Sequence, residues 1–484
     1  MNRPVVNSAR LRGALSRRIG PLLGAIVLAV TLAVVPGSAS ARQTAVTPEQ
    51  AASLGKQAYD YGFPLLEFTR VRREMTSVKC PTDHGEAPVN SFSHAGGFAN
   101  ATARTVVAPN TDTLYSIAHL DLGKGPMVIS HPAMGKRYYS FEFLDPYTNV
   151  IDIPGLREDG GKAGSYVIKW KGHAGKGKKP KGARVIKSDY RRVWLIGRTL
   201  ATDAKDQRKA QKLMSKYGLT NLKGKAKKFK KGCKPGEPKT FPTPTTGPEF
   251  IAALNKALDD NPPPKRDKPL LDQLETVGIG PGLPGDGQGL GADAQAALYK
   301  GIADEAAGLP GRARLNVLTE AQKTAGWLLP PSNIGDYGTD YEFRALIAIV
   351  GLGANTPDEA IYPSGITDGT GALYNGANQY RLTFAPGDAP PARFFWSLTM
   401  YDGSGYLVDN PLDRYSIGPS HPPLVKQSDG SIVIAIQATD PNDPTVNWLP
   451  SPATGNFRLS LRLYGPSKAA RSGAWRPPGV VQVG

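Results

Sequence analysis

Two short polar segments, one in each half of the chain, contain side chains that could bind or transform a polar ligand. The first, 110–115, contains Asn110, Asp112 and Tyr115 next to two threonines. An amide, a carboxylate and a phenol beside a strand suit the recognition of hydroxyl and carboxyl groups. The alternative is a turn after Pro109, in which these side chains hydrogen-bond to the backbone. The pattern favours the turn and leaves ligand binding open.

The second segment, 409–415, has the same ambiguity. Arg414 could orient a ligand, whereas Asn410 followed by Pro411 is typical of a structural turn. Flat aromatic rings in this half of the chain could stack against a sugar, although Trp396 alternates with an apolar neighbour and is expected in the core. The predicted ligand-binding residues are Asn110, Asp112, Tyr115, Tyr401, Asn410, Arg414, Tyr415 and Trp448, and the predicted ligand is a polar, carbohydrate-like small molecule or an envelope polymer.

Signatures of catalysis are weak. The chain has no Gly-x-Ser-x-Gly elbow, and its six histidines form no HxH or HxxxH pair, so neither a serine hydrolase of that type nor a metal site is predicted. No cofactor is expected. If the chain is an enzyme, we expect a hydrolase or lyase that uses carboxylate, phenol and guanidinium groups. The candidate catalytic residues are Asp112, Tyr115, Glu142, Arg198 and Arg414.

The first 41 residues have the three parts of an export signal: arginines, an apolar run at 26–35, and the small residues Ala39-Ser40-Ala41. The apolar run is shorter than the roughly 20 residues that a spanning helix needs. We therefore predict cleavage after Ala41, no remaining membrane anchor, and a secreted or envelope-associated protein. Arg17-Arg18 leave open whether export is general or by the twin-arginine route.

The positive charge of the chain is concentrated in two lysine-rich insertions. Removal of the signal lowers the net charge from +18 to +13, and the segments 169–187 and 223–239 each contain eight basic residues. Because glycines space these residues, the insertions are expected to be mobile, solvated loops. They could attract an anionic surface. Nucleic-acid binding is not expected, since no recognition motif or stacking aromatic accompanies the lysines.

The chain has only two cysteines, Cys80 and Cys233. In an oxidising compartment an isolated pair favours one disulfide, whereas a metal site would need more ligands. Two separate buried thiols are the alternative. Cys233 lies in a polar lysine-rich segment where an unpaired thiol would be exposed, so we predict the disulfide.

The hydrophobic pattern predicts alternating helical and strand-rich regions. Thr47-Pro48-Glu49-Gln50 is a helix start with a capping box, and Pro64 is expected to kink or divide the helix that follows. Short apolar runs between 104 and 200 predict an antiparallel sandwich. The middle region is expected to contain helices at 204–217, 248–258, 292–306 and 315–327, and the last region strands at 379–384, 394–400, 432–436 and 457–464.

Several segments resemble a known pair of families. They include Ala108-Pro109-Asn110-Thr111-Asp112 and Leu144-Asp145-Pro146-Tyr147 in the first half, and Phe394-Phe395-Trp396-Ser397 and Asn447-Trp448-Leu449-Pro450 in the second. On these segments the chain resembles proteins that join two domains of unknown function, families 1254 and 1214. The resemblance implies a mainly β fold with α: an immunoglobulin-like β-sandwich, a helical middle and a C-terminal jelly roll. The expected boundaries are 1–41 for the signal, 42–200, 201–330 and 331–484. The resemblance implies no reaction, substrate or catalytic residue.

Overall fold

The computed structural model describes residues 46–104, 108–173, 175, 177–285, 289–324, 326–421 and 424–483, and the side chains of all of these except 314–323. The predicted export signal lies outside the described residues. Within them the fold is mixed α and β, with eight α-helices and 19 strands in several sheets. None of the helices described is both long enough and apolar enough to cross a membrane.

The first helix, α1 (Pro48–Met75), begins with the predicted capping box. The backbone N–H of Gln50 donates to the Thr47 hydroxyl, and the Gln50 side chain accepts from the Thr47 N–H. Pro64 lies inside α1 but does not divide it. Although proline removes a helical hydrogen bond, α1 is buried along one side against the other helices, and this packing supports the continuous helix.

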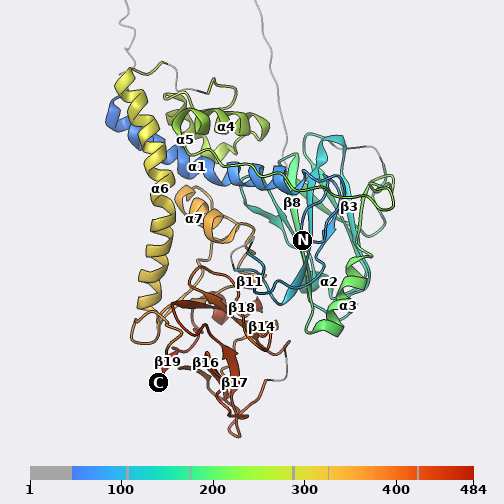
Figure 1. Cartoon of the computed structure of the whole chain (residues 1–484). Coiled ribbons are helices and arrows are strands. Elements are labelled where there is room, and N and C mark those ends of the chain that lie inside the picture. Colours follow the sequence, from blue (N-terminus) through green and yellow to red (C-terminus); the bar gives the residue numbers. More distant parts are fainter. Residues whose placement is uncertain are drawn as a thin grey trace, which may run out of the picture. The chain divides into compact units, whose positions relative to one another are not determined.

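The other helices pack with α1 around one hydrophobic core. The two helices predicted at 292–306 and 315–327 form one, α6, which continues through Pro310. Glycines bring α1 and α6 together, because a Cβ at Gly55 would lie 2.4 Å from the Leu298 carbonyl oxygen and a Cβ at Gly301 would lie 2.2 Å from the Ala52 carbonyl oxygen. These helices lie together in Figure 1. They are α4 (Gly247–Asp260), α5 (Lys268–Glu275), α6 (Ala292–Lys323) and α7 (Tyr341–Gly351).

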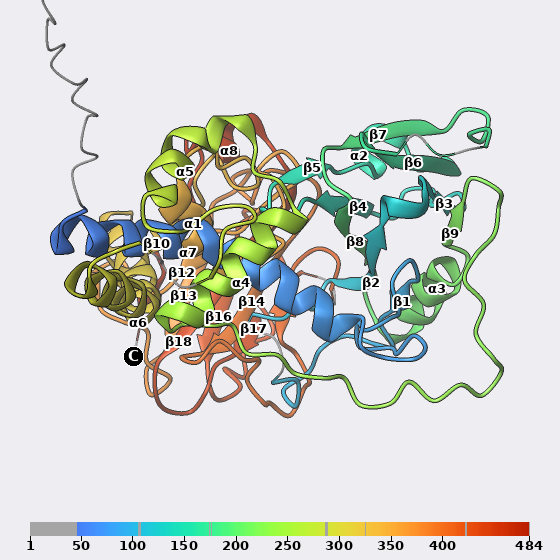
Figure 2. The same cartoon turned by 90° about the horizontal axis from the view of Figure 1, so that it is seen from above.

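The N-terminal strands form two sheets that share a second core, a sandwich-like arrangement seen from above in Figure 2. One sheet has the order β1 (Ser93–His94), β2 (Thr113–Asp121), β8 (Arg192–Leu200), β4 (Tyr139–Leu144) and β5 (Val150–Asp152). The other has the order β7 (Arg184–Ser188), β6 (Gly164–Trp170), β3 (Met127–His131) and β9 (Gly218–Asn221). Three short helical elements accompany these sheets: α2 (Leu156–Asp159), α3 (Ala204–Met214) and the 3-10 helix η1 (Leu122–Lys124).

The antiparallel prediction was wrong for one strand pair, and the loop prediction was wrong for part of the first lysine-rich insertion. β7 pairs with β6 in parallel, and residues at both ends of 169–187 lie in these strands. A parallel pair needs a connection of a dozen or so residues, and the lysine-rich insertion supplies it. Arg184 forms ion pairs with Asp152 and Glu158, so this insertion is partly ordered and partly neutralised.

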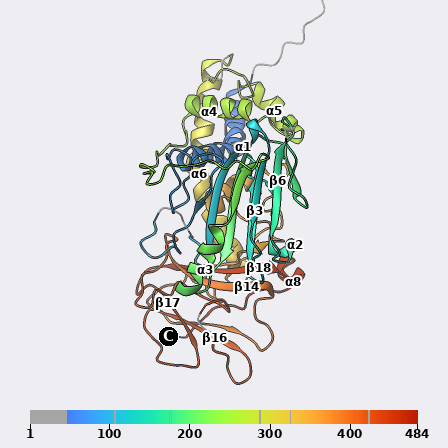
Figure 3. The ribbon, with the colours of Figure 1, turned by 90° about the vertical axis from the view of Figure 1, so that its right-hand side faces the viewer.

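The C-terminal strands also form two sheets around a shared core. One has the order β10 (Trp327–Leu328), β12 (Ser364–Gly365), β18 (Phe457–Pro466), β14 (Ala392–Asp402) and β15 (Ser416–Ile417), with β11 (Ala360–Ile361) also paired to β18. The other has the order β17 (Asn447–Pro450), β16 (Ile432–Gln437), β13 (Tyr380–Phe384) and β19 (Val481–Gln482). Figure 3 shows β14 and β18 between the N-terminal sheets and β16. The remaining elements are α8 (Lys468–Arg471) and η2 (Lys265–Asp267).

Strand periodicity gives β14 and β18 two different buried faces. The odd-numbered residues of β18 from Phe457 to Leu463 are apolar and lie in the C-terminal core. Successive side chains of a strand point to opposite faces, so Arg462 and Tyr464 lie on the other face, and both are buried. On β14, Ser397 and Tyr401 likewise alternate with core residues. The second face is therefore largely polar and mostly covered, with Phe395 as a buried apolar member.

The expected disulfide between Cys80 and Cys233 is present, with the two Cα atoms 6.3 Å apart. It joins the segment after α1 to the second lysine-rich insertion. Two hydrogen bonds connect the same two segments. The Lys79 N–H donates to the Pro235 carbonyl, and the Lys239 N–H donates to the Ser77 hydroxyl.

Candidate functional site

The loop before β2 covers the polar face of β14 and β18. Ala108 has a φ of 52°, a left-handed conformation that a residue with a Cβ rarely adopts. Its N–H donates to the Gly405 carbonyl, and its carbonyl accepts from Arg462. The hydroxyl of Tyr401 donates to the Pro109 carbonyl at 2.6 Å. The C-terminal sheet thus holds this loop through its backbone.

Asn110 forms the turn that the sequence favours and also makes a contact across to β18. Its Oδ1 accepts from the N–H groups of Asp112 and Thr113 at 2.7 and 3.0 Å, and its Nδ2 donates to the Tyr464 hydroxyl at 2.6 Å. Asn110 therefore forms the predicted turn with its Oδ1 and binds a phenol with its Nδ2. That phenol is Tyr464 of the same chain, and not a ligand.

Asp112 is the buried centre of a hydrogen-bond network. Its side chain is 0% exposed, and its two oxygens accept separately from His421 Nε2 at 2.7 Å and from the Ser397 hydroxyl at 2.6 Å. Burial alone would raise the pKa of Asp112, but the hydrogen bonds from these two groups and the nearby charge of Arg462 hold that pKa below its usual value. Asp112 is therefore a carboxylate that fixes the imidazole of His421.

His421 lines a cavity of about 210 Å³, called here the His421 cavity. Arg414 and Trp448, both predicted ligand-binding residues, line the same cavity. One guanidinium nitrogen of Arg414 donates to the Trp448 carbonyl at 3.0 Å, and the Trp448 indole N–H donates to the Gln437 carbonyl at 2.9 Å. The complete lining is Arg414, Ser416, Ile417, His421, Val425, Val446, Asn447 and Trp448.

His421 and Ser416 line the His421 cavity, and the buried Asp112 contacts His421 from outside the lining, but the three residues do not have the order of a serine-hydrolase relay. Such a relay needs the aspartate and the serine on opposite imidazole nitrogens. Here Asp112 and the Ser416 hydroxyl both contact Nε2, at 2.7 and 3.1 Å. Among the described residues, no hydrogen bond involves His421 Nδ1. The geometry therefore does not support Ser416 as a nucleophile activated by a relay.

Three of the predicted catalytic residues, the buried Glu142 and Arg198 and the partly buried Tyr115, form a second cluster away from the lining of the His421 cavity. Arg198 donates to Glu142 at 2.6 Å and lies over the ring of Tyr115, 5.6 Å from its centre. It also donates to Asn355 and to the Gly353 carbonyl, both at 2.9 Å. Burial raises the pKa of Glu142, against the opposing effect of Arg198. This cluster ties the outer face of the N-terminal sheet to the chain after α7.

The remaining predicted ligand-binding residues have structural contacts. Tyr401 is 1% exposed, and its hydroxyl accepts from Arg462. Asn410 makes four hydrogen bonds within its own loop. The Tyr415 hydroxyl donates to Asp413 and accepts from the Ala101 N–H. None of these three is part of the lining of the His421 cavity.

Sequence reasoning missed His421, Ser416 and Arg462. A single histidine without a nearby ligand partner carries no signal, since the residue that fixes it lies 309 positions away. Arg462 had a usable signal, because it alternates with the leucines of a strand that the sequence predicts. An arginine on the far face of a core strand indicates that this face is covered by something polar.

The comparisons with known proteins agree with the two-part organisation described above. Residues 89–221 match the model of the family described as "Protein of unknown function (DUF1254)", and residues 359–468 match that of "Protein of unknown function (DUF1214)". The resemblance inferred from the sequence is confirmed, and the chain contains a segment of each family. No curated protein matches it.

Two solved structures are similar over most of the chain. The VPA0106 protein from Vibrio parahaemolyticus is 24% identical, with 90% of this chain and 100% of that chain covered and a TM-score of 0.65. An uncharacterized protein from Burkholderia cenocepacia is 13% identical, with 90% and 94% covered and a TM-score of 0.41. The first likeness shows the fold alone.

Proposed function

We propose that this chain binds a small, polar, carbohydrate-like ligand with an acid group in the His421 cavity. The observation that carries the proposal is the placement of His421, fixed by the buried Asp112, beside Arg414 in one cavity. Arginine suits carboxylate recognition because its donors form a planar fork. One of its nitrogens donates to the Trp448 carbonyl, so this contact orients the guanidinium and leaves its other N–H groups for a ligand.

The size of the cavity limits the ligand. At about 210 Å³, the cavity is smaller than the roughly 300–1,000 Å³ of typical ligand pockets. It suits one sugar ring or a compound of similar size, and not a polymer segment. Trp448 supplies a ring against the apolar face of a sugar.

Isothermal titration with glucuronate and glucose tests the proposal. We expect saturable binding of glucuronate, weaker binding of glucose, and about a tenfold or greater loss of glucuronate affinity in Arg414→Gln, as for the loss of a hydrogen bond to a charged group. Arg208→Gln is the matched control, because Arg208 is exposed on α3 and loses the same charge. Binding that is equal in the two variants, or absent in the wild type for both sugars, would contradict the proposal.

A second function, proton abstraction by His421, is favoured by the place of His421 in the lining and by its Nε2, which already contacts Asp112 and so leaves Nδ1 to take the proton. Asp112 accepts from Nε2 and would stabilise the imidazolium that forms when Nδ1 takes a proton from a ligand. This is the lyase form of the enzyme hypothesis, with Arg414 holding the acid group. In such an elimination the carbon that loses the proton forms a double bond to its neighbour, and a substituent on that neighbour leaves with the electron pair of its bond. Formation of this unsaturated product, and its loss in His421→Gln, would support the lyase function. Binding without turnover leaves the chain as a binding protein.

Export and envelope association remain part of the proposed function. The disulfide between Cys80 and Cys233 supports an oxidising compartment. The second lysine-rich insertion supports attraction to an anionic surface. We also infer an immunoglobulin-like domain at 42–200, a helical region at 201–330 and a jelly-roll domain at 331–484. The two sandwich assignments are supported by the core that each pair of sheets shares.

A further inference from the structure

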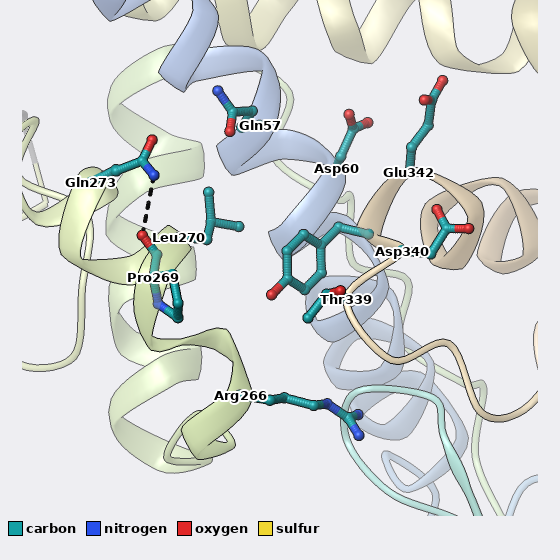
Figure 4. Close-up of a pocket in the computed structure, with 10 residues that line it drawn as sticks. Gln57, Asp60, Arg266, Pro269, Leu270, Gln273, Thr339, Asp340 and Glu342 are labelled. Carbon is teal, nitrogen blue, oxygen red and sulfur yellow. Dashed lines mark hydrogen bonds between the residues drawn. The ribbon is translucent and has the colours of Figure 1, made fainter.

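A second cavity, of about 540 Å³, lies among the helices and is separate in its lining from the His421 cavity. We call it the Asp60 cavity. It lies between α1, α5 and the start of α7 (Figure 4). Asp60, Asp340 and Glu342 lie on one side in this view, and Arg266 lies at the opposite end. Leu270 adds an apolar wall. Its volume is within the range of pockets that hold organic ligands.

The three carboxylates differ in their partners. Asp340 caps α7 by accepting from the Phe343 N–H, and Glu342 accepts from Arg312 at 3.3 Å. Asp60 has a buried Oδ1 that receives no hydrogen bond among the described residues. Buried polar atoms are nearly always hydrogen-bonded. The other oxygen of Asp60 also accepts no hydrogen bond from the described residues, so the carboxylate that lines the cavity is free to accept one from a ligand.

The surroundings of Asp60 set its protonation. Burial is the main reason that its pKa is raised to about 7, and the negative charge of Glu342 acts in the same direction. The positive charges of Arg312 and Lys56 oppose this rise. A cationic ligand would lower that pKa again by favouring the carboxylate. Binding of a cation and ionisation of Asp60 are therefore linked.

We propose that the Asp60 cavity binds an organic ammonium compound, with its N–H groups on Asp60 and Glu342 and its apolar stem against Leu270. Inorganic cations fit less well, because a single ion would leave most of about 540 Å³ empty. Among the described residues, no group of three or more His, Cys, Asp or Glu side chains could hold a metal ion. Tyr341, also in the lining, supplies an aromatic ring of the kind that attracts ammonium groups.

Calorimetric titration of the chain with 1,4-diaminobutane and with spermidine tests this site. At pH 8 and physiological ionic strength we expect saturable binding of at least one amine, and a loss of about 10- to 100-fold in Asp60→Asn. Lowering the pH to 5.5 should weaken binding to the wild type, because Asp60 then holds a proton. Asp60→Asn should fold normally, since the change removes a buried carboxylate without a partner. Glu342→Gln is the second variant.

The matched control is Asp272→Asn, which removes one negative charge from an exposed position of α5 outside the cavity lining. It should bind the amines as the wild type does, and so should Arg414→Gln, which separates this site from the His421 cavity. The inference is overturned if neither amine binds saturably. It is also overturned if Asp60→Asn binds like the wild type, or if Asp272→Asn loses as much affinity as Asp60→Asn.

Discussion

At the scale of single residues, the molecule depends on polar side chains that are buried only because they have partners. Asp112 has Ser397 and His421, and Arg462 has Thr399 and Tyr401. A buried polar group without a partner costs free energy that its partnered form does not. Both oxygens of Asp112 accept hydrogen bonds, which suits a residue that organises a site. The Oδ1 of Asp60 accepts none from the described residues, which fits the ligand-binding role proposed above.

Replacement of Asp112 by asparagine tests its role as the fixed carboxylate. We expect Asp112→Asn to lower the free energy of unfolding by about 1–3 kcal/mol at pH 7, the cost of weakening a buried hydrogen-bond network. Because the pKa of Asp112 is lowered in the folded chain, its charged form adds stability above the ordinary aspartate pKa of about 4. That contribution is lost as the pH falls through the folded pKa, so the difference from the wild type should shrink below about pH 4.

Urea unfolding at pH 7 and at pH 3 measures this difference, with Asp409→Asn as the control because Asp409 is exposed. If both variants lose the same stability at pH 7, or if the Asp112→Asn difference does not depend on pH, Asp112 does not act as a buried carboxylate.

The sequence predicted single residues unevenly. Asp112 and Arg414 could be chosen because carboxylate and guanidinium groups are the types that chemistry needs. Their convergence with His421 could not, since it depends on a contact between residues 112 and 421 across the whole fold. Glu142 and Arg198 were placed in the same pool as Asp112, but the pairing of β4 with β8 directs them to a different cluster. Residue type is visible in a sequence, whereas strand register is not.

At the scale of elements, local signals predicted what local interactions decide. The start of α1 follows from the capping box, which is formed within four residues. β7 was missed because arginine and lysine flank its apolar pair Val185-Ile186, so that the segment resembles a charged loop. Its strand conformation comes from the parallel pairing with β6. The polar outer faces of β14 and β18 were visible as an alternation, but the loop that covers them is distant in sequence.

The disulfide provides a prediction at this scale. Cys80 and Cys233 are 153 positions apart, and closing a loop of that length stabilises a chain by about 2–5 kcal/mol in the chain-entropy model. Cys80→Ser with Cys233→Ser should therefore lower the midpoint of thermal unfolding, while α1 keeps its helical content because its cap and core packing remain.

Calorimetry of the double variant and of the wild type with a reducing agent should give the same lowered midpoint. An unchanged midpoint would show that the hydrogen bonds of the Lys79 and Lys239 N–H groups keep the two segments together without the covalent bond. Recovery of both thiols free in nonreducing peptide mapping would contradict the disulfide itself.

At the scale of the whole molecule, the two family segments are joined by buried hydrogen bonds between polar groups, here called a polar seam, and not by apolar contacts alone. The loop at 108–112 reaches β14 and β18, and the Tyr138 hydroxyl donates to Glu359 at 2.6 Å. Residues 46–484 accordingly form one compact unit. Polar seams of this kind fix the relative position of two parts through geometry. The His421 site depends on both family segments, because Asp112 comes from the N-terminal segment and His421 and Arg414 come from the C-terminal segment.

The last prediction concerns the charge of the whole molecule. The second insertion, 223–239, lies outside the lining of both cavities and has eight exposed or partly exposed lysines with one acid, Glu237. The first insertion has less unpaired positive charge to attract an anionic surface, since its Arg184 forms ion pairs with Asp152 and Glu158. The disulfide fixes the second insertion at one point of the molecule, which gives its charge a defined position. We therefore expect this insertion to supply most of any attraction to an anionic surface.

Sedimentation with vesicles that contain anionic lipid measures this attraction. Binding should fall steeply as salt rises, because charges are screened over about 8 Å at physiological ionic strength. Replacing the eight lysines of 223–239 with serine should release the protein, while glucuronate binding in the His421 cavity and amine binding in the Asp60 cavity stay unchanged. The control is a variant in which the exposed lysines of α3 are replaced instead. Salt-independent binding would contradict an electrostatic tether, and loss of ligand affinity in a folded serine variant would make the insertion part of a binding site.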